Sequence, residues 1–197
     1  MKLSVVIQSG GQSRRMGQNK ALMPFHGQPL IARVAERMRP IAGELLVITN
    51  QPQDYAFLNL PLEGDRVSGK GPLGGLFTAL EAAHYELVVV VACDMPFVSP
   101  QLLQAEAELL EAEGWDVVIP ELDGGLEPLH AVYRKAACLP EIRRALEEGR
   151  LRLDSWLGDV RVYKMDEAHL RKVDPELHAF MNVNTPEEFQ AAEGLDP

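Results

Sequence analysis

A segment rich in glycine and basic residues directly follows the first apolar run of the chain. That run, residues 3–7, is short and rich in β-branched residues, which predicts a buried strand. Glycines let the backbone after it approach a ligand closely, and successive N–H groups in such a loop form a concave site for anions. Arg14, Arg15 and Lys20 add charges suited to phosphate oxygens. We therefore predict a phosphate-binding loop, whose glycines are Gly10, Gly11 and Gly17.

A flexible surface turn with incidental basic residues is the plainer interpretation of the same segment, since glycine is the commonest turn residue. Its position at a strand end and its cluster of cations in an acidic protein favour phosphate binding instead. The segment lacks the GxGxxG spacing of dinucleotide-binding folds. A P-loop would need lysine directly after its second glycine, followed by Ser or Thr. Here Lys20 lies between Asn19 and Ala21, so the loop is of neither kind.

A second candidate is an aspartate that follows the most hydrophobic run of the chain. Residues 87–92 predict a buried central strand, and Asp94 lies just beyond its end. In open α/β sheets ligands bind beyond the carboxyl ends of the strands, and Mg²⁺ takes one or two protein carboxylates beside substrate phosphates. Asp94 is therefore the predicted metal ligand, although an aspartate here could also simply cap the turn. Cys93 is interpreted as a small buried hydrophobic residue.

A third candidate joins Asp65 to a glycine-rich helix start. The proline after Gly71 suits the first position of a helix over residues 71–84, and Gly74 and Gly75 follow at once. Free N–H groups and the helix dipole would then face the crevice. The Asp65 carboxylate could accept a hydrogen bond from a base or a ribose. The alternative role for Gly74 and Gly75 is close packing of the helix on the sheet, and the two roles are compatible.

A fourth candidate is a pair of amide side chains, Asn182 and Asn184, that precede a helix start. By itself the pattern indicates capping, because Thr185 is a good N-cap and Glu188 completes a capping box. Histidine and serine offer no competing centre. The histidines, at positions 26, 84, 130, 169 and 178, show no metal-ligand spacing, and the serines show no recognisable nucleophile turn. His130 could line the crevice, but a structural role is favoured.

Strands and helices alternate along the chain, which is typical of a mostly parallel sheet covered by helices on both faces. We expect one α/β domain over residues 1–197, since no linker, repeat or low-complexity stretch divides the chain. Further strands are expected at residues 44–49, 116–120, 129–134 and, weakly, 160–165. Further helices are expected at residues 29–38, 99–113, 136–148, 151–157 and after Thr185, with a short helix and a short strand within residues 52–65.

Composition limits the possible partners and the compartment. The 29 acidic and 19 basic residues give a net charge of -10, which makes nucleic acid and anionic membranes poor partners. Cys93 and Cys138 are far apart, so neither a disulfide framework nor a zinc site is expected. No stretch approaches the roughly 18 apolar residues of a membrane span, and the N-terminus has no signal-peptide pattern. We expect a cytoplasmic protein.

The four segments taken in order resemble the molybdenum cofactor guanylyltransferases. The motifs that carry this resemblance are, in chain order, GGxSxRMGxxKALM after the first strand, GPLGGL, CDMPF at the end of a strand, and NVNTPEEF. The resemblance therefore covers nearly the whole length of the chain. The first segment is shared with many nucleotidyltransferases. The glycine pair, GPLGG and NVNTPEE favour the guanylyl branch. The resemblance implies a doubly wound, mostly parallel but mixed sheet of the Rossmann-like nucleotidyltransferase type.

The resemblance also implies GTP and molybdopterin, or its molybdenum form, as substrates and Mg²⁺ as cofactor. It further implies transient contacts with other proteins of molybdenum cofactor biosynthesis or with acceptor proteins. The pterin phosphate would attack the α-phosphorus of GTP and release pyrophosphate. Lys20 would neutralise GTP phosphates and Asp94 would hold the metal, with Arg15 as a third catalytic residue. The implied nucleotide contacts are Gln8, Ser9, Gly10, Gly11, Asn50, Asp65 and Gly71, and the implied pterin contacts are Arg15, Gly74, Gly75, Asn182 and Asn184.

The sequence departs from the family pattern at two places. Gln8-Ser9 stands where the family usually has Leu-Ala, and Asn19 stands where it usually has Asp. Two alternatives stay open at this point. One is a related transferase that moves CMP to the pterin or a nucleotide to a sugar phosphate. The other is a non-catalytic protein that only binds nucleotide or cofactor.

Overall fold

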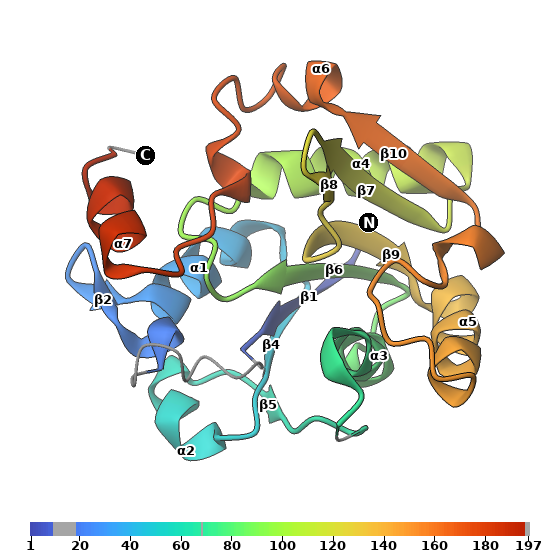
Figure 1. Ribbon diagram of the computed structural model, residues 1–197, viewed down its shortest axis with the longest axis horizontal. Coiled ribbons are helices and arrows are strands. Elements are labelled where there is room, and N and C mark those ends of the chain that lie inside the picture. Colours follow the sequence, from blue (N-terminus) through green and yellow to red (C-terminus); the bar gives the residue numbers. More distant parts are fainter. Residues whose placement is uncertain (10–18, 68, 196–197) are drawn as a thin grey trace.

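One large mixed sheet organises the part of the chain that the computed structural model describes, residues 1–9, 19–67 and 69–195 (Figure 1). Apolar, β-branched runs form its central strands, which are buried along their whole length, as in sheets covered on both faces. In order across the sheet, the strands are β10 (Val162–Asp166), β7 (Val117–Leu122), β9 (His130–Arg134), β6 (Leu87–Ala92), β1 (Leu3–Gln8), β4 (Glu44–Ile48) and β5 (Leu62–Glu63).

The seven strands in this order are parallel except around β9. This strand lies between β6 and β7 and is antiparallel to both, so β6 and β7 point the same way. The pairs β1–β6, β1–β4, β4–β5 and β7–β10 are all parallel. The short β8 (Gly125–Leu126) pairs antiparallel with β7. The carboxyl ends of β1, β4, β5 and β6 therefore meet at one edge of the sheet, and the expected mixed sheet with a central β6 is confirmed.

Helices cover both faces of the sheet, and the strands divide their side chains between them. Figure 1 shows α1 (Leu30–Met38) and α4 (Pro100–Glu113) on the side opposite α3 (Gly71–Ala82) and α5 (Lys135–Glu147). Along β1, Val5 and Ile7 pack in the core with α1 and α4, whereas Val6 packs with α3 and α5. This is the two-residue alternation of a strand with apolar contacts on both faces. No helix within the described residues is long and apolar enough to cross a membrane.

The helix starts follow the expected capping chemistry. Ser99 caps α4 by accepting a hydrogen bond from the Leu102 N–H, and Gly114 ends this helix in the left-handed conformation. Thr185 and Glu188 form the expected capping box at the start of α7 (Pro186–Glu193). This last helix is important for the site because it begins directly after Asn184.

The helix predicted over residues 151–157 is wrong. A bend at residue 152 and turns over residues 153–156 precede a 3-10 helix, η5 (Leu157–Asp159). Local contacts close these turns, because the Arg150 guanidinium donates to the Ser155 carbonyl and the Trp156 indole N–H donates to the Leu153 carbonyl at 2.9 Å. The Trp156 side chain is wholly buried. The apolar spacing in this segment therefore reflects a buried tryptophan in a turn rather than a helix face.

Several short elements complete the description. The strands β2 (Pro24–Phe25) and β3 (Gln28–Pro29) form a hairpin whose turn residues, His26 and Gly27, both have positive φ. The expected short helix and strand within residues 52–65 are present as α2 (Pro52–Tyr55) and β5. The remaining short helices are η2 (Lys20–Leu22), η3 (Arg39–Ile41), η4 (Ala56–Leu58), α6 (Glu167–Leu170) and η6 (His178–Phe180).

Candidate active site

Polar side chains gather where the parallel strands end. Gln8 closes β1, Asn50 follows β4, Asp65 follows β5 and Asp94 follows β6. Neighbouring strands hold these ends together, because Gln8 is paired with Ile48 of β4 and with Ala92 of β6. This edge is the usual ligand site of open α/β sheets.

Lys20 joins three distant parts of the chain at this edge. Its Nζ lies 3.2 Å from Asp94 Oδ2 and 2.6 Å from Asn184 Oδ1. The Lys20 side chain is 13% exposed and the Asp94 side chain 22%. The segment before α7 is fixed on the turn after β6, because the Val183 N–H donates to the Asp94 carbonyl at 3.0 Å. The structure thus brings together the predicted lysine, the predicted metal ligand and one of the two predicted amides.

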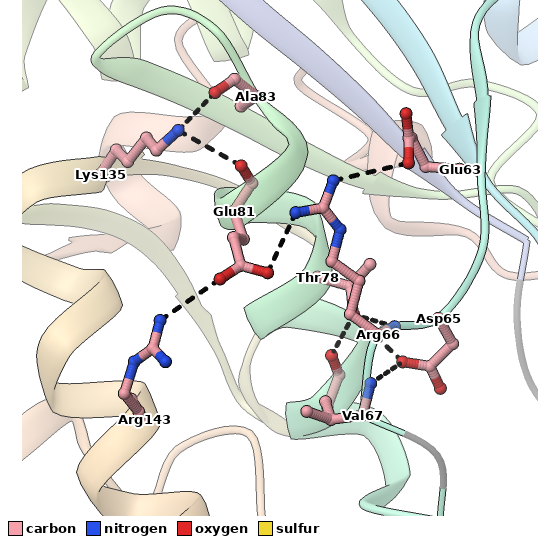
Figure 2. A network of polar contacts seen from close by, with 10 residues as sticks. Glu63, Asp65, Arg66, Val67, Thr78, Glu81, Ala83, Lys135 and Arg143 are labelled. Carbon is pink, nitrogen blue, oxygen red and sulfur yellow. Dashed lines mark hydrogen bonds and ion pairs between the residues drawn. The ribbon is translucent and has the colours of Figure 1, made fainter.

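Asp65 is held by Asn50, just after β4, and by Thr78 on α3. Its N–H donates to Asn50 Oδ1 at 2.9 Å, and its Oδ1 lies 3.0 Å from the hydroxyl of the buried Thr78. Figure 2 shows this carboxylate close to Thr78, Arg66 and Val67. Within the described residues its Oδ2 has no hydrogen-bond partner. Asn50 therefore orients Asp65 in the free protein, and one carboxylate oxygen stays available to a ligand.

Ion pairs fix the loop after β5 against α3. Arg66 lies 3.1 Å from Glu81 and 3.5 Å from Glu63, and Arg143 of α5 lies 3.3 Å from the other oxygen of Glu81 (Figure 2). Each pair is partly exposed and contributes little alone. Together they connect β5, α3 and α5 around the loop that carries Asp65.

The glycines at the start of α3 serve either a positive φ or close packing. Gly71 has a φ of +62°, a conformation that favours glycine. A Cβ on Gly74 would lie 2.9 Å from the Lys70 Cβ, and a Cβ on Gly75 would lie 3.0 Å from Gln8 Oε1. The Gln8 contact supports the expected role of Gly75 in packing the helix on the sheet, whereas Gly74 packs against the loop just before the helix. Their predicted contact with the pterin stays a prediction.

Tyr55 is a site residue that the sequence did not reveal. Its hydroxyl accepts hydrogen bonds from Ser9 Oγ at 2.6 Å and from Asn19 Nδ2 at 2.8 Å. Asn19 also caps η2 by accepting from the Ala21 N–H. Burial raises the pKa of the Tyr55 hydroxyl, which therefore stays protonated. One buried tyrosine thereby fixes both ends of the predicted phosphate loop, at the two places where the sequence departs from the family pattern.

Other predicted site residues lie apart from this cluster or outside the described residues. Asn182 is exposed, and its amide donates to the Phe180 carbonyl at 3.4 Å rather than reaching Lys20. Arg15, Gly10 and Gly11 fall in residues 10–18, outside the described part of the chain. Their roles stay predictions.

Cys93 and His130 are structural rather than catalytic. Burial raises the pKa of the Cys93 thiol to about 12, so it is not a thiolate at neutral pH. The His130 side chain is wholly buried, with Nδ1 3.5 Å from Glu106 Oε1 and its ring centroid 4.7 Å from that of Phe180. Burial also raises the pKa of Glu106 to about 6. His130 therefore does not line the crevice, and its expected structural role is supported.

The side chains at this edge suit a hard cation that takes few ligands from the protein. Among the described residues, no cluster of three or more His, Cys, Asp or Glu side chains could hold a metal. Asp94 supplies one carboxylate, and Oδ1 of that carboxylate has no hydrogen-bond partner in the described segments. Mg²⁺ is usually held by one or two carboxylates with substrate phosphates and waters completing its shell. The residues present therefore fit Mg²⁺ that arrives with a nucleotide.

Known proteins are similar to this chain in sequence and in fold. Residues 5–162 match the family model described as the MobA-like NTP transferase domain. A protein of Carboxydothermus hydrogenoformans, named probable molybdenum cofactor guanylyltransferase, is 37% identical over 95% of this chain and 93% of its own. The molybdenum cofactor guanylyltransferase of Desulfosudis oleivorans is 36% identical with the same coverage. The chain belongs to the molybdenum cofactor guanylyltransferase family.

Solved structures agree with membership of this family. The molybdopterin-guanine dinucleotide biosynthesis protein A of Archaeoglobus fulgidus superposes with a TM-score of 0.83 and 32% identity, and the match covers 97% of each chain. A 4-diphosphocytidyl-2C-methyl-D-erythritol synthase of Anaerococcus prevotii superposes with a TM-score of 0.70 at 13% identity, over 98% of this chain and 95% of its own. The second likeness concerns the fold alone, which is therefore the nucleotidyltransferase fold of the family.

Proposed function

We propose that the protein transfers GMP from GTP to the terminal phosphate of molybdopterin, forming the guanine dinucleotide form of the cofactor and pyrophosphate. The observation that carries this proposal is the contact of Lys20 with Asp94 and Asn184 at the carboxyl edge of the sheet. The names of the relatives point to the same reaction. The substrates are small molecules, and we propose that the reaction takes place in the cytoplasm.

The reaction needs little covalent chemistry from the protein. An oxygen of the pterin phosphate attacks the α-phosphorus of GTP, and the bond from that phosphorus to the bridging oxygen of pyrophosphate breaks. Lys20 offsets charge on the phosphates, and the surrounding loops hold the reacting oxygens in line. Asp94 would hold Mg²⁺, which supplies further charge neutralisation to the triphosphate.

Phosphate binding would also rearrange Lys20. In the free protein its charge is balanced by Asp94, and phosphate oxygens offer stronger, multiply charged partners. The Asp94 carboxylate would then be free to bind the metal that accompanies the nucleotide. The Lys20–Asp94 pair therefore suits a site whose two charges separate when GTP and Mg²⁺ bind together.

The remaining proposed contacts divide between the two substrates. Gln8, Ser9, Gly10, Gly11 and Gly71 would meet the nucleotide, and Asp65 would accept from the nucleoside with Asn50 in support. Arg15, Gly74, Gly75, Asn182 and Asn184 would help to place the pterin. The fixed position of Asp65, with one carboxylate oxygen available, supports the nucleoside assignment.

The proposal predicts that Asp94→Ala abolishes pyrophosphate release in the presence of GTP, molybdopterin and Mg²⁺. We expect a loss of at least about a hundredfold in kcat, the scale seen when a charge-stabilising group is removed. The variant should still fold, because the Asp94 carboxylate is partly exposed and its backbone carbonyl is retained. Circular dichroism checks this point.

Glu111→Gln is the matched control, since this carboxylate is exposed on α4 and near the opposite edge of the sheet. It should keep wild-type turnover. Near-normal turnover of Asp94→Ala would contradict the assignment of Asp94 as the metal ligand.

A further inference from the structure

Gln8 carries a buried side-chain amide whose nitrogen is unpaired in the part of the chain that the structure describes. Its side chain is enclosed, with the residue only 8% exposed, and its Nε2 has no hydrogen-bond partner among the described residues. Buried donors are nearly always paired, because leaving one unpaired is costly. An unpaired amide at the ligand edge of the sheet therefore points to an acceptor that arrives with a ligand.

The backbone around Gln8 is already committed to the sheet. The Gln8 carbonyl accepts from the Cys93 N–H at 3.1 Å, and the Ser9 N–H donates to the Ile48 carbonyl at 2.9 Å. A ligand therefore finds these two main-chain groups occupied. The side-chain amide is the group that Gln8 can offer.

The amide faces the first turns of α3. Gln8 lies on the same face of β1 as Val6, which packs in the core that α3 shares. Its Oε1 lies where a Cβ on Gly75 would come within 3.0 Å, so the glycine leaves room for the amide. Thr78, three residues later on the same helix, holds the Asp65 carboxylate. Residues three apart are neighbours on a helix surface, so α3 supports both Gln8 and Asp65.

We propose that Gln8 Nε2 donates a hydrogen bond to O6 of the guanine base and is a specificity-determining residue. This inference rests on the proposed function, since it takes GTP as the nucleotide. Guanine presents the acceptor O6 beside two donors, N1–H and the 2-amino group. The Asp65 carboxylate accepts from the donors while the Gln8 amide supplies the donor for O6. The unpaired amide of the free protein then becomes paired in the complex.

Gln8→Leu separates this role from a packing role, because leucine keeps much of the volume and removes the polar atoms. In the free protein the variant should keep or gain thermal stability, since an unpaired donor is removed. Its Kd for GTP should rise about tenfold, the effect of one lost hydrogen bond. Calorimetric titration and thermal melts measure the two quantities.

Two nucleotide analogues locate the contact on the base. The triphosphate of 2-aminopurine riboside lacks O6 and, with it, the N1–H donor, whereas inosine triphosphate keeps O6 and N1–H but lacks the 2-amino group. Wild-type protein should prefer GTP over the analogue without O6, and Gln8→Leu should reduce this preference about tenfold, because the loss of N1–H weakens binding to both proteins alike. Both proteins should show the same preference for GTP over inosine triphosphate. Gln190→Leu, at an exposed position on α7, is the control and should match wild type throughout.

Two results would overturn the inference. One is a Gln8→Leu variant that keeps the wild-type preference for GTP over the analogue without O6. The other is a less stable variant that loses affinity equally for every nucleotide, which would indicate packing only. A different result would overturn the proposed reaction but keep the base contact. In that case wild-type protein prefers GTP over the analogue without O6 more strongly than Gln8→Leu does, but releases no pyrophosphate with molybdopterin. Absence of GTP binding by wild-type protein would overturn both.

Discussion

At the scale of single residues, the two asparagines before α7, Asn182 and Asn184, have different surroundings although the sequence predicted the same role for both. Asn184 Oδ1 accepts from Lys20 Nζ at 2.6 Å, whereas the Asn182 amide reaches only the Phe180 carbonyl. The backbone of Asn184 is held by Glu188, whose carboxylate accepts from the N–H groups of Asn184 and Thr185. Asn184 therefore orients Lys20 in the free protein, whereas a direct contact of Asn182 with a substrate stays a proposal.

Asn184→Ala should lower kcat/KM for GTP about tenfold, because Lys20 loses a charge-assisted hydrogen bond that orients it. Asn182→Ala should leave kcat/KM for GTP within about twofold and act on the KM for molybdopterin. Steady-state kinetics with each substrate varied in turn measures both effects. Identical profiles for the two variants would contradict the distinction between the two amides.

Residue types and positions predicted much of this cluster. Lys20 and Asp94 were identifiable because each follows a recognisable strand, and the structure does bring their charges together. The contact of Asn50 with the Asp65 N–H was not predictable, since it depends on how the ends of β4 and β5 align. Tyr55 was missed for a related reason: its hydroxyl meets Ser9 and Asn19 across distances in sequence that no local pattern encodes.

At the scale of elements, the short helix α2 serves to present Tyr55 to the two ends of the predicted phosphate loop. Pro52 begins this helix, and the Tyr55 side chain at its end is buried. Both hydrogen bonds to the Tyr55 hydroxyl come from residues that flank the loop. The helix thus limits the conformations that the flanking residues can adopt.

Tyr55→Phe should therefore reduce kcat/KM for GTP about tenfold while the fold is retained, since phenylalanine keeps the buried ring and leaves Ser9 Oγ and Asn19 Nδ2 without this acceptor. Steady-state kinetics measures kcat/KM for GTP, and a thermal melt shows whether the fold is retained. Tyr85→Phe is a suitable control, because the Tyr85 hydroxyl makes no hydrogen bond within the described ranges. Wild-type kinetics in Tyr55→Phe would contradict the claim that the hydrogen bonds from Ser9 and Asn19 to the Tyr55 hydroxyl support GTP binding.

Long periodic elements were predictable with their bounds, whereas the short helix and strand within residues 52–65 were expected without bounds and the β2–β3 hairpin was not expected. Apolar runs and caps located α3, α4 and the central strands because these features are local. The hairpin β2–β3 has strands of only two residues each, too short for a periodic signal. The helix predicted over residues 151–157 was wrong although its apolar spacing was helical. That spacing includes the buried Trp156, which lies in a turn stabilised by local hydrogen bonds.

At the scale of the whole molecule, the alternation of strands and helices predicted the layers but not the strand order. The apolar run of β6 indicated its central position, which the sheet confirms. The insertion of the antiparallel β9 between β6 and β7 could not be predicted, because it depends on which edge accepts the returning strand. This order keeps the ends of β1, β4, β5 and β6 adjacent, and the proposed reaction depends on that edge.

The identity of the transferred nucleotide tests the proposed function most directly. Wild-type protein is incubated with Mg²⁺, molybdopterin and each of GTP, CTP, ATP and UTP in turn, and pyrophosphate release is measured. The proposed function predicts release with GTP and only background release with the other three nucleotides. Preference for CTP, or no release with any nucleotide despite tight GTP binding, would contradict it.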